Sequence, residues 1–141
     1  MNATPPDVST IDREYAGESH TLRWARRDVV DWLNEVGVDR ETTERASLIA
    51  SELATNAIQV APGVQYQLRA RAMTRTTASI AIRSRSAGAV PPPRASWRPV
   101  DDLAIRGRGL SIVEALSDEV TVETNDGDVV VTAWFRIVSE R

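Results

Sequence analysis

The sequence predicts an α+β domain of two layers, in which a mixed, mostly antiparallel sheet carries its helices on one face. Up to residue 60, apolar residues recur every three or four positions, which is typical of amphipathic helices. From residue 64 they alternate with polar residues, which is typical of half-buried strands. The chain has 141 residues, of which 42% are hydrophobic, and this length suits a single core.

The first two elements are predicted helices. Residues 18–36 carry one apolar stripe, and Gly37 follows as a stop signal. A second helix is expected from Asp39, whose carboxylate can cap it, to Pro62-Gly63, which ends it. Residues 18–141 are therefore predicted to form one domain, preceded by a polar segment, 1–17, that could add an edge strand.

Four segments alternate in the manner of strands and lie close to turn signals, which favours antiparallel neighbours. They are Val64–Ala72, Ala78–Ile82, Val120–Thr124 and Val129–Ile137. The last two are joined through Asn125-Asp126-Gly127-Asp128, a strong hairpin signal.

Between the two strand pairs, residues 84–106 show no periodicity and contain several prolines. Loops of this length inside a compact domain are uncommon and often serve as lids over a site. Gly107-Arg108-Gly109 is then expected to open a third helix, Leu110–Leu116.

Composition excludes several classes of function. The chain has no cysteine, and all 17 of its basic residues are arginine. Thiol chemistry and a P-loop, which requires a lysine, are therefore excluded. The net charge of −3 gives no electrostatic reason to expect nucleic-acid or membrane binding. The first ten residues resemble neither a signal peptide nor a membrane span, so a cytoplasmic location is expected.

Two polar features could carry chemistry. Glu52 and Asn56 lie one turn apart on the second predicted helix, beside its apolar stripe. Their oxygens could hold Mg²⁺ and water, although two polar residues on a helix flank can also be ordinary surface. The glycines around Arg108 could let the backbone approach a phosphate at a helix N-terminus, or could form an ordinary turn.

Taken together and in this order, the motifs resemble those of the histidine-kinase-like (GHKL) ATPase superfamily. Glu52-Leu53-Ala54-Thr55-Asn56-Ala57 resembles its N-box, and Gly107-Arg108-Gly109-Leu110 resembles its second glycine box. The segments from Ala25-Arg26 to Trp32-Leu33 and Thr132-Ala133-Trp134 are similar to the anti-sigma regulatory factor, or serine-protein kinase, branch. The resemblance covers roughly Thr21 to Ile137 and implies a Bergerat-type ATP-binding fold.

The resemblance implies a serine/threonine protein kinase that phosphorylates an anti-sigma antagonist and sequesters a sigma factor. Asn56 would ligate the Mg²⁺ that bridges the ATP phosphates, and Glu52 would act as the base. Residues 107–110 would wrap the phosphates, residues 87–106 would form the lid, and Thr132 would lie near the adenine. The family resemblance also suggests a homodimer.

The sequence departs from the family at the adenine site. The family's aspartate after the second inner strand falls on Ser84, and of the glycines that follow it only Gly88 remains. Loss of a charge-assisted hydrogen bond costs about 1–3 kcal/mol, which weakens binding about ten- to a hundredfold. Two alternatives therefore stay open: a degenerate, non-catalytic binding module on the same fold, and an unrelated interaction domain whose motifs match by chance.

Overall fold

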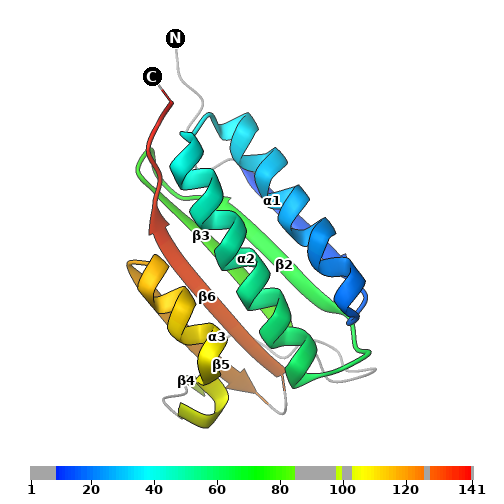
Figure 1. The fold of residues 1–141 in the computed structure, drawn as a ribbon. Coiled ribbons are helices and arrows are strands. Elements are labelled where there is room, and N and C mark those ends of the chain that lie inside the picture. Colours follow the sequence, from blue (N-terminus) through cyan, green and yellow to red (C-terminus); the bar gives the residue numbers. More distant parts are fainter. Residues whose placement is uncertain (1–8, 85–97, 100–102, 126–127, 141) are drawn as a thin grey trace.

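The computed structural model describes residues 9–84, 98–99, 103–125 and 128–140. Strands and helices follow one another in the order that Figure 1 shows. The strands are β1 (Thr10–Tyr15), β2 (Tyr66–Ala72), β3 (Thr77–Ser84), β4 (Arg98–Pro99), β5 (Glu119–Asn125) and β6 (Asp128–Arg136). The helices are η2 (Ser19–Thr21), a short 3-10 turn, α1 (Leu22–Val36), α2 (Arg40–Val60) and α3 (Leu103–Leu116).

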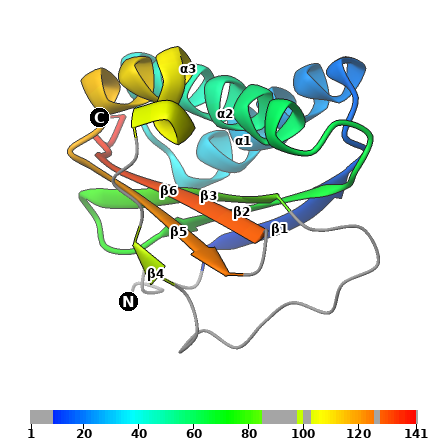
Figure 2. The same cartoon turned by 90° about the horizontal axis from the view of Figure 1, so that it is seen from below.

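The six strands form one sheet in the order β1-β2-β3-β6-β5-β4. The three α-helices cover one of its faces, with α2 between α1 and α3 (Figure 2). This is the predicted two-layer α+β architecture. All pairings between described strands are antiparallel, so the expectation of a mixed sheet is wrong for the described part of the chain.

Both long helices end where the sequence predicts, and α2 begins after Asp39 as expected, but α1 begins at Leu22, four residues after the predicted start, and follows the 3-10 turn η2. The apolar stripe of α1 is buried, and Gly37 ends the helix in the left-handed conformation, with φ of 90°. At the start of α2, a carboxylate oxygen of Asp39 accepts a hydrogen bond from the backbone nitrogen of Thr42 at 2.9 Å. This cap satisfies one of the free N–H groups of the first turn, and it holds the pKa of Asp39 below its ordinary value of 3.8, because Thr42 donates to the charged form.

Alternation along the strands separates the core from the second face of the sheet. Every second residue of β2 is buried, beginning with Tyr66. In β6 the buried series beneath the helices includes Val131, Ala133 and Phe135. The residues between them line the face of the sheet that the helices leave uncovered.

The third helix is longer than predicted. It begins at Leu103, seven residues before Leu110 and ahead of Gly107-Arg108-Gly109. The glycines therefore lie inside the helix and do not open it. The predicted aperiodic loop also contains a short strand, β4, paired with β5. The rest of the expected lid lies outside the described residues.

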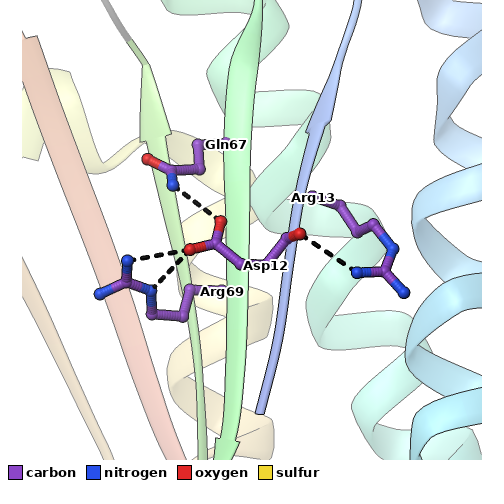
Figure 3. A network of polar contacts seen from close by, with 4 residues as sticks. All are labelled: Asp12, Arg13, Gln67 and Arg69. Atoms are coloured by element: carbon purple, nitrogen blue, oxygen red, sulfur yellow. Dashed lines mark hydrogen bonds and ion pairs between the residues drawn. The ribbon is translucent and has the colours of Figure 1, made fainter.

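Strand β1 lies within the segment 1–17 and forms an edge of the sheet, as the sequence suggested. Figure 3 shows how Asp12 ties it to β2. The Asp12 carboxylate accepts from Gln67 Nε2 at 2.7 Å and from Arg69 Nη2 at 2.9 Å, and its backbone oxygen accepts from Arg13 at 3.1 Å. Burial alone would raise the pKa of Asp12, but these donors and the arginine charges lower it overall.

Gly17, which follows β1, packs closely against the backbone of Val64, which precedes β2. A Cβ atom on Gly17 would lie 2.2 Å from the backbone oxygen of Val64, so only glycine fits there. Nearby, the Tyr15 hydroxyl donates to Asp28 of α1, and the Tyr66 hydroxyl lies 2.8 Å from Thr21 Oγ1. Burial raises the pKa of Tyr15, as does its bond to Asp28, and burial also raises that of Tyr66.

Candidate functional site

The candidate site is built on the second half of α2. Glu52 and Asn56 lie one turn apart and are both half-buried, whereas Leu53 and Ala57 between and beside them are fully in the core. The amphipathic pattern thus places the two polar side chains at the edge of the core. Neither makes a hydrogen bond or ion pair with another described residue, so their oxygens are free to meet a ligand.

Neighbouring polar residues hold this part of α2 against α1. Arg26 of α1 donates from Nη1 to Ser51 Oγ at 3.2 Å. The Thr55 hydroxyl bonds back to the carbonyl of Ser51 at 2.8 Å, within the helix. The position of Glu52 is therefore set by a rigid helix that is linked to its neighbour. Helical spacing predicted Glu52 and Asn56, but it gave no sign of the bond from Arg26.

The glycine motif lies on the helix that packs beside α2 (Figure 1). Residues Gly107, Arg108 and Gly109 are helical, and Leu110 after them is fully buried. Inside an α-helix, peptide N–H groups bond to the carbonyl four residues earlier. In this conformation the motif therefore does not present the free N–H groups that a phosphate requires.

Ser84 ends β3 on the face that the helices cover. Its exposed fraction is 4%, and it pairs with Tyr66 on one side and Val129 on the other. It thus lies on the same side of the sheet as α2, as an adenine contact would require. The structure therefore supports the placement of Ser84 and leaves its role as a prediction.

Thr132 lies on the opposite face of the sheet from Ser84 and α2. It pairs with Ala81 on the uncovered face and lines a hollow of about 650 Å³ there, with Arg69 and Trp134 among the other lining residues. The expectation that it lies near the adenine is therefore wrong for this arrangement. Alternation in β6 could have shown this, because its apolar neighbours Val131 and Ala133 face the helices. Gly88, predicted to contact the nucleotide, lies outside the described residues.

The donor atoms available for a metal are few. The described residues contain no group of three or more His, Cys, Asp or Glu side chains that could hold an ion. The oxygens of Asn56 and Glu52 remain. Mg²⁺ is commonly bound by one or two protein oxygens together with waters and substrate phosphates, so this set fits Mg²⁺ held jointly with a nucleotide.

Comparison with known proteins identifies the class. Residues 16–134 match the family model of the histidine kinase-like ATPase domain, and the chain belongs to that family. No curated protein matches the chain.

A solved structure of the RsbU and RsbW domains of Rv1364c from Mycobacterium tuberculosis has a similar fold. Its TM-score is 0.68 at 17% sequence identity, over 91% of this chain. The match spans 32% of that longer chain, about a third of its length. Among the helices of the described residues, none has the length and apolar character needed to cross a membrane.

Proposed function

We propose that this chain is an ATP-binding regulatory protein of the anti-sigma type, which phosphorylates a serine or threonine of an antagonist protein and sequesters a sigma factor. The observation that carries the proposal is the pair Glu52 and Asn56, half-buried and unpaired among the described residues. Membership of the ATPase family and the fold shared with a structure containing an RsbW domain support it. The cytoplasmic location expected from the sequence belongs to this proposal.

In this proposal Asn56 would hold Mg²⁺ through its carboxamide oxygen. The bound ion would neutralise charge on the phosphates of ATP. Glu52 accepts the proton of the partner's hydroxyl while that oxygen bonds to the γ-phosphorus. The bond between the γ-phosphorus and the bridging oxygen breaks, ADP leaves, and Glu52 returns its proton to water. Positioning and charge supply most of the rate in such transfers, so a single base on a rigid helix suffices.

A second candidate is a non-catalytic binding module on the same fold. Two observations favour it: Ser84 supplies no carboxylate at the adenine position, and the glycine motif is helical. Such a module would bind partners with weak nucleotide affinity or none, and it would not need Glu52.

Titration calorimetry with Mg-ATP separates the two candidates. For the kinase we expect saturable binding to the wild type. The variant Glu52→Gln should keep that binding, because only the base is lost, whereas Asn56→Ala should lose about tenfold or more and respond less to magnesium removal. ATP turnover should fall about 10²- to 10⁴-fold in Glu52→Gln. No heat at about 1 mM nucleotide would overturn the kinase proposal and leave the module.

A further inference from the structure

One face of the first helical segment combines exposed aromatic and basic side chains. His20, Arg23, Trp24 and Arg27 are all exposed, and each lies three or four residues from two of the others. Trp24 is 44% exposed, which is unusual for the largest aromatic side chain. Helical spacing places the four on one face of the segment, opposite the buried stripe of α1.

The tryptophan already has an aromatic neighbour on this face. The ring of His20 meets that of Trp24 edge to face, with centroids 5.2 Å apart and an angle of 85°. Nδ1 of His20 lies 3.5 Å from a carboxylate oxygen of Glu18. An exposed aromatic side chain next to arginines has the composition of an interface anchor, because Trp and Arg are enriched among the residues that contribute most to binding.

Two exposed arginines, Arg23 and Arg27, lie on this face, although the chain has a net charge of −3. Neither Arg23 nor Arg27 makes an ion pair or hydrogen bond with another described residue. Two of the nearby acids are engaged elsewhere, since Asp28 accepts from Tyr15 and Glu18 lies beside His20. A third, the exposed Asp31, lies one turn after Arg27 and makes no ion pair with it. The two guanidinium groups are therefore available to carboxylates of a partner.

An anionic membrane is a poorer fit than an acidic protein. An interfacial helix inserts a broad apolar face into the lipid. In α1 that face is buried in the core, through Ala25, Val29, Trp32 and Leu33. Trp24 alone remains exposed among the large apolar side chains of the helix.

We propose that His20, Arg23, Trp24 and Arg27 form a docking surface for an acidic segment of a partner protein, with an apolar residue of that segment packed on Trp24. The inference rests on the partner-binding part of the proposed function, but not on catalysis. The helix that carries the surface also contacts the helix of the candidate site, because Arg26 bonds to Ser51, the residue before Glu52.

Random peptides displayed on phage test the chemistry of the surface. They are selected on the immobilised full chain at low salt, with excess Arg23→Glu/Trp24→Ala/Arg27→Glu protein as competitor in solution. We expect the selected peptides to combine Asp or Glu with an aromatic or aliphatic residue. Neutral or basic peptides would overturn the proposal.

A selected peptide is then synthesised and its affinity measured by fluorescence anisotropy. Trp24→Ala should weaken binding about tenfold or more, and Trp24→Phe by less. Arg23→Glu/Arg27→Glu should weaken it as much and reduce its dependence on salt. The control Arg40→Glu/Arg75→Glu changes the same charge at exposed sites elsewhere and should have little effect. Equal affinity for all variants would overturn the proposal.

Two further measurements distinguish a protein partner from a membrane and from a second copy of the chain. Wild type and triple variant should bind equally little to vesicles of equal parts phosphatidylcholine and phosphatidylglycerol. If the wild type binds these vesicles and the triple variant does not, the surface serves a membrane and the proposal fails. A change of oligomeric state in the triple variant would instead assign the surface to a second copy and overturn the proposal. Glu52→Gln should leave peptide affinity unchanged, and the triple variant should leave Mg-ATP binding unchanged, so the two proposals fail independently.

Discussion

Ser84 is the residue on which the two candidate functions divide. It lies buried at the end of β3, on the face covered by α2, where the family resemblance implies an aspartate that contacts adenine. A hydroxyl accepts a hydrogen bond, but it lacks the charge that strengthens such a bond.

Ser84→Asp should therefore strengthen Mg-ATP binding about ten- to a hundredfold. It should also destabilise the free protein, because the new carboxylate is buried without a partner until the nucleotide binds. Calorimetry gives the affinity, and thermal unfolding with and without nucleotide gives the stability. Ser84→Asn controls for size without charge. If a folded Ser84→Asp protein binds no more tightly than the wild type, Ser84 does not occupy the adenine position.

At the scale of residues, the sequence predicted those side chains whose position follows from the helical period. Glu52 and Asn56 lie where the stripe of α2 placed them. Thr132 was misplaced because its role came from the resemblance and not from the alternation of β6. Contacts between distant segments, such as that of Arg26 with Ser51, produce no periodic pattern in the sequence. They could therefore be found only from the structure.

At the scale of elements, α1, α2 and the strand pairs were predictable because each alternates or repeats with a clear period and ends at a capping or turn residue. The start of α3 was not predictable in this way. Glycine has a low helical propensity, so Gly107 and Gly109 indicated a helix start. In the structure, packing of α3 against α2 outweighs that preference.

This arrangement makes the helical state of the motif compete with phosphate binding. Replacing both glycines, Gly107→Ala/Gly109→Ala, should stabilise the helix by about 1 kcal/mol at each site. If the phosphates need the peptide N–H groups free, Mg-ATP affinity should fall about fivefold for each substitution. Melting temperature and calorimetry measure the two effects.

Ala115→Gly is the control, because it weakens the other end of the same helix and should lower stability without changing nucleotide affinity. A double alanine variant that is more stable but binds Mg-ATP as tightly as the wild type would show that the helix does not open for the phosphates.

At the scale of the whole molecule, shifted pKa values define a pH range of stability. The pKa values of Asp12 and Asp39 are lowered in the folded state, so their contribution is present above the ordinary value of 3.8 and is lost as pH falls through the lower folded values. Those of Tyr15 and Tyr66 are raised, so their contribution is present below the ordinary value of 10.0 and is lost as pH rises beyond it.

Urea unfolding across pH should therefore show a free energy of unfolding that falls at both ends of the range. Asp39→Asn keeps a capping oxygen but removes the titration, and should flatten the acid limb. Tyr15→Phe should flatten the alkaline limb and lower stability at neutral pH by about 1–2 kcal/mol, since Asp28 loses its donor. An unchanged alkaline limb in Tyr15→Phe/Tyr66→Phe would contradict this assignment.

The pairing of β3 with β6 at the centre of the sheet has a consequence for how the protein can diversify. These strands are neighbours in space, yet β4, α3 and β5 all lie between them in the chain. Doubling the length of a flexible connection costs only about 0.6 kcal/mol in closure entropy. Between Ser84 and Asp128, positions other than those that pack in the core, such as Leu110, Val113 and Val122, can therefore change while the central pairing holds. This leaves specificity for nucleotide and partner open to change on a constant scaffold.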